Sequence, residues 1–354
     1  MVNILITGGT GFIGVPLVKR LQNLGHNLKL LIRESSNITP FEGLNHIEYI
    51  TGDVRDYETL YKAGENVDLI YHLAAYTRMW AKDEKIIEDT NIKGTENIAK
   101  IALNNNKKLI YISSFIALGG TPPTPVDETH ESEEGLFLEY AKTKFHARKI
   151  IKKFIEKGLN ATIFYPGITY GPGDFNIFGQ IILYLTAKKY LGCPGKGETI
   201  GSFVYLNDVV DGLISAIDKN DLKGEEFILG GVNIKFTDWL DLIAEIVGKK
   251  RKPRHFPMSI ALMYGWLCEL MTKITNKAPF INKNPRIIFG PYINRATIKM
   301  IDYNWVYSSK KAIEKLGYKI TPLRKGLEET INWYKDIVEK KKEKRRIMNK
   351  NVRR

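Results

Sequence analysis

Apolar runs and helical patterns alternate along the first half of the chain. Runs that indicate buried strands lie at residues 4–6, 27–32, 47–50, 67–73, 108–113 and 162–165. Between them, apolar residues recur at three- and four-residue spacing, which predicts amphipathic helices. The first such helix carries Phe12, Ile13, Leu17, Val18, Leu21 and Leu24. Strands that alternate with helices predict an α/β fold with a doubly wound parallel sheet.

The first predicted strand passes into the first helix through a turn that is rich in glycine. Gly8, Gly9, Gly11 and Gly14 lie in it, and the last three fit the spacing Gly-x-Gly-x-x-Gly. Such a turn aims free N–H groups at one point, where the helix dipole adds positive charge. Because glycine has no Cβ, a pyrophosphate can approach the backbone, so the turn predicts a dinucleotide site. An ordinary tight turn before a surface helix is the alternative.

Two positions bear on the adenosine end of such a cofactor. Arg33 follows the second strand, where an acidic residue would bind a ribose 2′-hydroxyl and an arginine accommodates a 2′-phosphate. Arg33 therefore favours NADP over NAD, although Glu34 beside it is a conflicting signal and a plain surface arginine is the alternative. Asp53, followed by Val54, could accept a hydrogen bond from the adenine amino group or cap the helix that begins near Tyr57.

The fourth predicted strand ends in small residues. Leu73, Ala74 and Ala75 follow His72 there. Small side chains at this edge would let a flat cofactor lie close over the sheet. His72 stands in an apolar setting and is expected to be a satisfied core histidine rather than a catalyst.

The candidate chemistry lies at the end of the fifth strand and on the helix that follows. Tyr140 and Lys144 are four residues apart and share one face of that helix. A free phenol has a pKa of roughly 10 and is a poor catalyst at neutral pH, but a neighbouring ammonium would lower that pKa. Lys144 could also hold the nicotinamide ribose. Ser114 lies at a strand carboxyl end, where it could bond the same substrate oxygen as Tyr140, with Ser113 as the weaker candidate.

The regular alternation ends at Asp174. Helical patterns at 175–190 and 238–247 and short strands at 203–206 and 227–229 then weave between the sheet and a second lobe. We expect an NAD(P)-binding domain formed by residues 1–174 and about 203–230, a smaller interleaved substrate-binding lobe formed by about 175–202 and 231–335, and a basic tail formed by 336–354.

Composition restricts the class of protein. The chain has 354 residues, of which 44% are hydrophobic and 26% charged, as in ordinary globular proteins. Cys193 and Cys268 lie far apart, so we expect no metal site and no disulfide framework, and a reducing compartment such as the cytoplasm. The start of the chain predicts a strand and a loop rather than a signal peptide.

The net charge of +14 is concentrated near the end of the chain. Residues 339–354 hold nine Lys or Arg and two Glu. This tail is expected to be a solvated end or a contact with anionic lipid headgroups. Nucleic acid is not expected as a partner, because no binding motif or aromatic interleaving accompanies the charge.

Residues 256–274 form the most apolar segment late in the chain, and they are marginal in length for a membrane span. They predict a helix that covers the substrate pocket or an interfacial helix that touches a membrane or carries an apolar substrate. The segment and the tail together would give a peripheral membrane contact.

The whole motif set resembles the extended short-chain dehydrogenase/reductase family of the NAD-dependent epimerase/dehydratase superfamily. Within the family it is most similar to the branch of dihydroflavonol reductases, 3β-hydroxysteroid dehydrogenases and hopanoid-associated epimerase-like proteins. The resemblance covers roughly residues 1–335. The matching residues are 7–14, Gly52-Asp53-Val54, His72-Leu73-Ala74-Ala75, Asn91, Gly94-Thr95, Ser113-Ser114, Tyr140, Lys144, Pro166-Gly167, Gly171-Pro172-Gly173, Phe203-Val204-Tyr205 with Asp208, Leu316-Gly317-Tyr318, Gly326-Leu327 and Trp333.

The resemblance implies a Rossmann fold that binds NADP or NAD. Its glycine frame would be Gly8, Gly11 and Gly14, with the N–H groups of Phe12 and Ile13 on the pyrophosphate. It also implies Tyr140 as general acid/base, Lys144 as its partner, Ser114 as the donor to the substrate oxygen, and Pro166 beside the cofactor. Many relatives pair subunits through the helices that flank Asn91 and Tyr140, so a homodimer is implied.

Two departures from the family pattern matter. Relatives commonly carry Arg where this chain has Tyr165, which bears on contacts beside the nicotinamide. Sugar-nucleotide dehydratases place Asp-Glu after the catalytic hydroxyl, where this chain has Phe115-Ile116. Because these side chains cannot act as acid and base, dehydration is not expected, and an apolar wall should face the pocket.

Three functions remain open at this point. The first is an NADP-preferring oxidoreductase acting on a ketone or secondary alcohol of a largely apolar molecule. The second is a nucleotide-sugar epimerase, which consumes no cofactor. The third is a non-catalytic cofactor-binding module.

Overall fold

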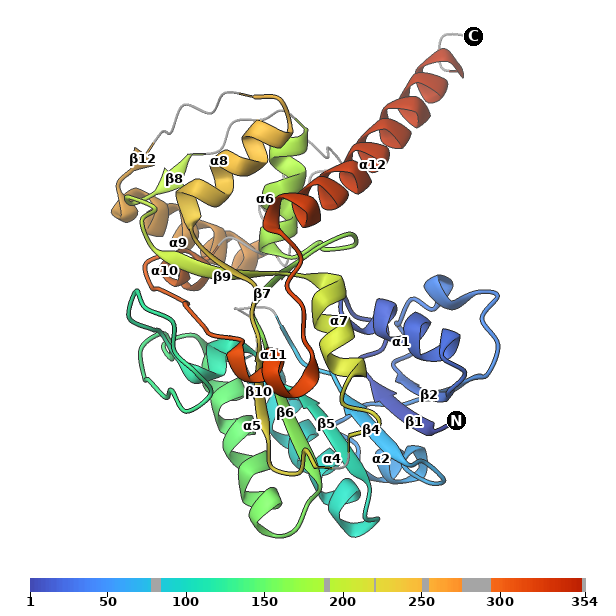
Figure 1. Cartoon of the computed structure of the whole chain (residues 1–354). Helices are drawn as coiled ribbons and strands as arrows, with labels where there is room; N and C mark the ends of the chain where they lie inside the picture. The colour runs from blue at the N-terminus through green and yellow to red at the C-terminus, as the bar shows by residue number, and fades with distance from the viewer. Residues whose placement is uncertain (78–83, 188–191, 220, 250–254, 276–293, 352–354) are drawn as a thin grey trace.

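The computed structural model of the protein describes residues 1–77, 84–187, 192–219, 221–249, 255–275 and 294–351. A seven-stranded parallel sheet forms its centre, in the order β10-β6-β5-β4-β1-β2-β3 (Figure 1). The predicted α/β fold with a doubly wound parallel sheet is therefore confirmed. The strands are β1 (Asn3–Thr7), β2 (Asn27–Ile32), β3 (Ile47–Thr51), β4 (Leu69–His72), β5 (Lys108–Ile112), β6 (Ala161–Pro166) and β10 (Glu226–Leu229).

Both faces of this sheet are covered by helices, because successive strand residues point to opposite faces. Ile4 and Ile6 of β1 pack with the helices of one face, whereas Leu5 packs with those of the other. The first set comprises α1 (Gly14–Asn23), α7 (Leu206–Ile214) and α11 (Lys310–Leu316), and the second comprises α2 (Tyr57–Ala63), α4 (Gly94–Asn104) and α5 (Glu139–Glu156).

The helical stretch before β5 is divided into three segments. They are α3 (Lys85–Glu88), a π-helical turn (Asp89–Lys93) and α4. Asn91 lies in the π-helical turn, and its side chain bonds both the N–H and the carbonyl of Tyr76, at 2.7 and 3.1 Å. The same amide nitrogen reaches Thr143 of α5 at 3.0 Å. These contacts depend on a local geometry that helical periodicity does not reveal.

The second half of the chain builds a smaller lobe above the carboxyl ends of the strands (Figure 1). Its strands are β7 (Ile168–Tyr170), β9 (Ile200–Tyr205) and β11 (Val232–Lys235) in one sheet, and β8 (Cys193–Pro194) with β12 (His255–Phe256) in another. The strand predicted at 203–206 thus pairs with β7 and β11 instead of joining the central sheet. The helices are α6 (Ile177–Thr186), α8 (Phe236–Ile246), α9 (Met258–Thr275), α10 (Arg295–Met300) and α12 (Leu323–Asn351).

The basic tail begins inside α12, which extends away from the body of the molecule (Figure 1). Its side chains from residue 340 onward lie outside the described residues, as do residues 188–190 of the helix predicted over 175–190. Among the helices that the structure describes, none combines the length and the hydropathy that crossing a bilayer requires.

Candidate active site

The glycine turn is pressed against the end of β4. Gly8 has a φ of +76°, and a Cβ there would lie 2.5 Å from the backbone nitrogen of Ala74. A Cβ on Gly14 would lie 2.2 Å from the carbonyl oxygen of Gly8. The only atom within 4 Å of a Cβ on Gly11 would be that same oxygen, at 3.2 Å. The protein's own backbone therefore requires glycine at positions 8 and 14, whereas Gly11 faces open space.

The open side of this turn presents backbone donors. Within the described part of the chain, the N–H groups of Phe12 and Ile13 donate no hydrogen bond, since the ladder of α1 starts with Val15 bonding the Gly11 carbonyl at 3.0 Å. Free N–H groups at the start of a helix, beside a glycine that faces open space, are what a pyrophosphate needs. The turn therefore fits a dinucleotide.

His72 occupies the centre of a fixed chain of hydrogen bonds. Thr95 donates to the Asn91 carbonyl at 2.7 Å, so its oxygen accepts from Nε2 of His72 at 3.2 Å. Nδ1 is then the acceptor for the Thr7 hydroxyl at 2.7 Å. Burial and then the nearby Lys144 lower the pKa of His72 to about 3, so the ring is neutral. This confirms His72 as a satisfied core histidine.

Tyr140 and Ser114 meet in the structure. Tyr140 projects from the first turn of α5, and Ser114 follows β5 and begins a short 3₁₀-helix (Phe115–Leu118). Burial raises the pKa of Tyr140 to about 12, and a hydrogen bond with Ser114 opposes the rise. The buried Ser113 hydroxyl lies beside Tyr111 instead. Of the two serines, Ser114 is therefore the one that interacts with the Tyr140 phenol.

Lys144 is buried one helical turn further along α5. Its Nζ donates to the Ile112 carbonyl at 2.9 Å and lies 4.9 Å from the centre of the Tyr111 ring. Burial lowers the pKa of Lys144 to about 7. The expected lowering of the Tyr140 pKa by Lys144 is therefore wrong for this structure, because burial acts against both charged forms.

Two arginines, Arg33 after β2 and Arg55 after β3, lie near Asp53. Arg55 lowers the pKa of Asp53 through a hydrogen bond and ion pair at 2.9 Å, and the charge of the exposed Arg33 adds a smaller lowering. The reading of Asp53 as a helix cap is wrong: Asp56 caps α2 by accepting from the N–H groups of Glu58 and Thr59. Asp53 instead remains a carboxylate at the turn after β3, held by Arg55.

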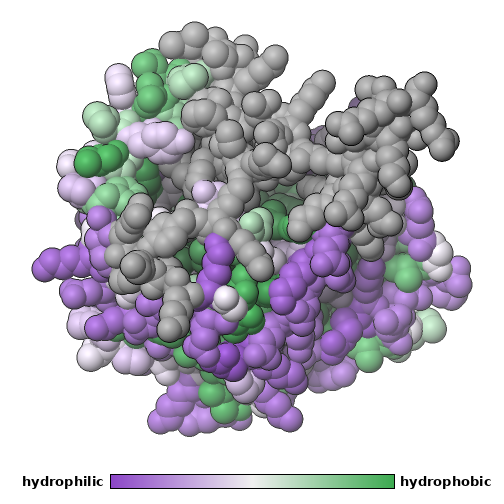
Figure 2. Space-filling view, turned by 90° about the horizontal axis from the view of Figure 1, so that it is seen from above, coloured by the Kyte–Doolittle hydropathy of each residue, from purple (hydrophilic) through white to green (hydrophobic). Residues whose placement is uncertain are grey.

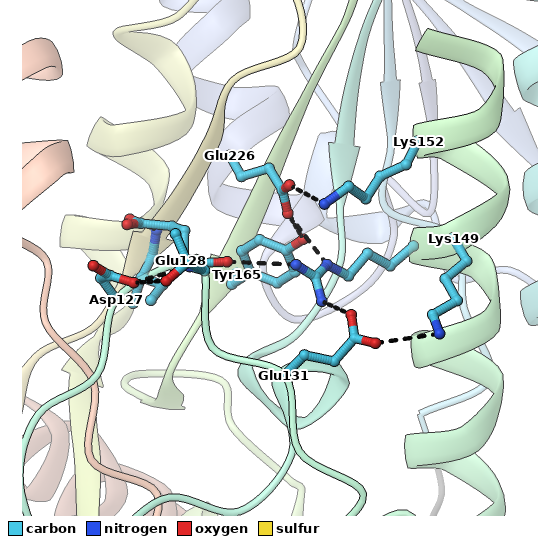
Figure 3. Close-up of polar contacts among 10 residues, drawn as sticks. Asp127, Glu128, Glu131, Lys149, Lys152, Tyr165 and Glu226 are labelled. Atoms are coloured by element: carbon cyan, nitrogen blue, oxygen red, sulfur yellow. Dashed lines mark hydrogen bonds and ion pairs between the residues drawn. The ribbon is translucent and has the colours of Figure 1, made fainter. Parts of the chain in front are cut away.

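Tyr165 belongs to a polar cluster between α5 and the sheet, shown in Figure 3. Its hydroxyl donates to Glu226, which also binds Arg148 at 3.2 Å and Lys152 at 2.7 Å. Arg148 is buried and reaches Glu131 of the loop before α5 at 3.1 Å. The side chain of Tyr165 is therefore engaged with Arg148 and Glu226, and Pro166 is the residue of β6 that stands at the carboxyl end of the strand.

An apolar pocket lies in the second lobe. Its cavity volume is about 40 Å³, or about 520 Å³ when the open space at its mouth is counted, and its walls come from β7, α6, β9, α8, α10 and the segment after α10. No charged residue of the described chain lines it. The Trp305 ring in its wall packs edge-on against Phe115 at 5.3 Å, and Tyr303 packs against Phe137 at 5.4 Å. Two wall residues of the pocket are thus packed against Phe115, which follows Ser114, and Phe137, which precedes α5.

Metal chemistry has no support in the described ranges, where His, Cys, Asp and Glu side chains form no group of three that could hold an ion.

A family model supports the nucleotide site. The model of the NAD dependent epimerase/dehydratase family matches residues 4–230, which span the glycine turn, Ser114, Tyr140 and Lys144. The chain belongs to this family. It is an enzyme of the extended short-chain dehydrogenase/reductase superfamily and depends on NAD or a close analogue, so the alternative of a non-catalytic module is set aside.

Individual relatives cover nearly the whole chain. A putative dihydroflavonol 4-reductase from Synechocystis is 25% identical over 94% of this chain and 94% of its own length. Sterol demethylase protein B from Methylococcus capsulatus is 26% identical over 94% of this chain and 98% of its own length. In fold, the chain matches UDP-glucuronic acid 4-epimerase from Bacillus cereus in complex with NAD, with a TM-score of 0.71, 21% identity, and coverage of 95% and 99%.

Several residues that shape the site were not predicted to do so. Thr7 and Thr95, which match family motifs, fix His72, and Arg55 holds Asp53. Tyr111 and Arg148 lie along the buried face of α5, and Arg148 has a signal in the sequence because it continues the four-residue spacing of Tyr140 and Lys144.

Proposed function

We propose that this enzyme interconverts a ketone and a secondary alcohol on a largely apolar molecule, with NADP as the preferred cofactor. The observation that carries the proposal is the uncharged pocket of the second lobe, whose wall residue Trp305 packs against Phe115, the residue after Ser114. A nucleotide sugar brings a pyrophosphate, which needs cationic partners, and the pocket supplies none among the described residues. The printed names of the Synechocystis and Methylococcus relatives, a dihydroflavonol reductase and a sterol demethylase component, agree with an apolar substrate.

In reduction, Ser114 and Tyr140 would both donate hydrogen bonds to the carbonyl oxygen. A bound nicotinamide supplies the hydride that reaches the carbonyl carbon. Tyr140 keeps its proton at neutral pH because its pKa is about 12, and it passes that proton to the oxygen as negative charge develops there. The phenol regains a proton from solvent, so a ketone, a hydride and a proton give an alcohol.

Lys144 would bind the nicotinamide ribose and stabilise the transient phenolate. Its buried ammonium lies on the same face of α5 as Tyr140, and its pKa of about 7 lets it change protonation state near neutral pH. The NADP preference rests on Arg33. Its exposed side chain follows β2 and lies near the carboxylate of Asp53, which follows β3.

A nucleotide-sugar epimerase is the second candidate, and the family name favours it. An epimerase turns substrate over without net change in NAD(P)H, so absorbance of the reduced cofactor separates the two functions. The division of the chain into a cofactor-binding part and a substrate lobe, and a homodimer paired through α4 and α5, are proposed on the family resemblance alone.

The test uses sterol, flavonoid and sugar-nucleotide substrates with NADPH, NADH and their oxidised forms. Tyr140→Phe should lower turnover roughly 10²- to 10⁴-fold while leaving cofactor binding unchanged. Tyr49→Phe is the matched control, since Tyr49 is an exposed tyrosine on the edge strand β3. Full activity of Tyr140→Phe would contradict the proposal, and product formed without net cofactor change would favour the epimerase.

A further inference from the structure

Helix α9 packs into the second lobe through its small residues and turns its large apolar residues outward. Ala261 and Cys268 are buried, and a Cβ on Gly265 would lie 2.8 Å from Ile298 of α10. The outer face of α9 is 37% to 63% exposed. It consists of Ile260, Met263, Tyr264, Trp266, Leu267 and Leu270.

These six residues form one surface. Their spacing of three, four and seven positions places them on a single side of the helix. Hydrophobic side chains gather at one edge of the lobe in Figure 2, on the side where Figure 1 places β12 and α9. Monomeric proteins rarely expose a contiguous patch of large apolar side chains unless it binds a partner.

The stretch of sequence that contains α9 is strongly basic. Residues 247–301 contain eleven Lys or Arg and a single acidic residue, Glu269, which is buried and bound to Arg295 at 2.7 Å. Together with nine basic and two acidic residues at 339–354, these stretches leave 33 basic and 36 acidic residues for the rest of the chain. The positive charge of the protein therefore belongs to the sequence around α9 and to the tail.

We propose that the outer face of α9 binds an anionic lipid surface, with the helix lying in the plane of the membrane interface. An apolar face flanked by basic residues is the pattern of interfacial helices, in which apolar burial and attraction to anionic headgroups act together. A second copy of this chain fits less well, because two such faces would bring like charges together. Like the other described helices, α9 is not long and apolar enough to cross a bilayer.

The location of α9 gives this contact a consequence, which rests on the proposed function. Helix α10 contacts both α9 and the apolar pocket: Ile298 of α10 faces Gly265, whereas Thr297 and Met300 of α10, and Ile301 after it, line the pocket. Binding of α9 to lipid would therefore hold the pocket next to the phase in which an apolar substrate dissolves.

The test is sedimentation of the full-length protein with phosphatidylcholine vesicles that contain or lack phosphatidylglycerol. We expect binding to the anionic vesicles, weakened by salt, and a loss of roughly tenfold or more in Trp266→Ser/Leu267→Ser. Ile313→Ser is the matched control, because Ile313 is 47% exposed on α11 and should bind as the wild type does. If the first pair fails to fold, Ile260→Ser/Met263→Ser tests the same face.

Equal binding by the α9 variants and the wild type, or no binding by the wild type, would overturn the proposal. So would a wild-type dimer in sedimentation velocity that the α9 variants convert to monomer without any vesicle binding. Cofactor affinity, measured without vesicles, reports on the catalytic proposal independently, so failure of one proposal is distinguished from failure of the other.

Discussion

The two regions that we propose as the cofactor wall and the substrate wall are built in opposite ways. The cofactor wall consists of the glycine turn 8–14 and the ends of β4 and β5, and its surfaces are backbone atoms and short polar side chains in fixed contact. The substrate wall consists of the pocket lining and is made of large apolar side chains from six separate elements. On the cofactor wall a single added methyl group would collide with backbone, whereas the substrate wall only needs side chains of suitable size.

This difference separates what the two walls can specify. A fixed backbone suits the cofactor, because its pyrophosphate is the same in every turnover and free N–H groups must converge on it. An apolar wall discriminates weakly between molecules that differ by one methylene, since each such group contributes only about 1 to 3 kcal/mol. Substitutions on the two walls should therefore differ in kind as well as in size.

Gly14→Ala should produce the largest effect. Its Cβ would lie 2.2 Å from the Gly8 carbonyl oxygen, so the turn must move, and we expect a loss of about 3 kcal/mol in the free energy of unfolding. Cofactor affinity should fall roughly 100-fold or more, because the turn that carries the donors is displaced.

Gly11→Ala is the matched comparison for that change. Its Cβ would meet the Gly8 carbonyl oxygen at 3.2 Å and otherwise enter the open side of the turn. We expect stability within about 1 kcal/mol of the wild type but clearly weaker cofactor binding. Denaturant unfolding and cofactor titration measure the two quantities. Equal loss of stability in both variants would show that the turn is not the rigid backbone frame described above.

Lys144→Met should reveal the cost of burying an ammonium on α5, where it bonds the end of β5 beside the cofactor wall. Burial lowers the pKa of Lys144 to about 7 from 10.5, so between these values the unfolded chain binds more protons than the folded one. The stability of the wild type should therefore rise with pH through this window, by about 3 kcal/mol between about pH 7 and 9.5 relative to Lys144→Met.

The comparison is made by urea unfolding without cofactor at several pH values. Lys142→Met is the control, because Lys142 is an exposed lysine on the same helix, ion-paired with Glu139 at 2.6 Å. It should leave the pH dependence of stability as it is in the wild type. A wild-type profile parallel to that of Lys144→Met would mean that the ammonium is not penalised by burial.

The same contrast explains what could be predicted from the sequence. The glycine turn could be predicted from the sequence, because close backbone contacts restrict Gly8 and Gly14 to glycine and so leave a motif. The parallel sheet followed from the alternation of apolar runs and helical patterns. Tyr140 and Lys144 were placed on one helix face by spacing alone, although their protonation depends on burial that spacing does not show.

The substrate wall could not be predicted in this way. Trp305 and Phe115 are 190 positions apart, and their contact at 5.3 Å follows from chain topology rather than from any local pattern. Tyr165 was interpreted from its position in the strand, while its partners Arg148 and Glu226 come from other elements. The pairing of β9 with β7 and β11 likewise depends on how distant segments meet.

Phe178→Ala tests the substrate wall directly. Phe178 lines the pocket and packs against Phe203 at 5.7 Å, so its removal enlarges the pocket and loses apolar contact. The KM for an apolar ketone should rise roughly tenfold or more, while the dissociation constant for NADP stays unchanged. Phe154→Ala, at a half-buried position on α5, controls for lost stability. A change in NADP affinity as large as the change in KM would break the distinction between the walls.

Arg33→Ser should have the smallest effect and acts only at the adenosine end of the cofactor wall. An exposed arginine that meets a 2′-phosphate contributes a charge-assisted hydrogen bond, so we expect affinity for NADP to fall about tenfold while affinity for NAD stays the same. Arg20→Ser is the control, because Arg20 is an exposed arginine on α1 that pairs with Asp211 at 2.6 Å. Calorimetric titration of both variants with both cofactors measures the ratio. An equal loss of affinity for NADP and NAD would mean that Arg33 attracts both cofactors through its charge alone. If neither affinity falls, Arg33 does not decide the preference, and Arg55 becomes the next arginine to test.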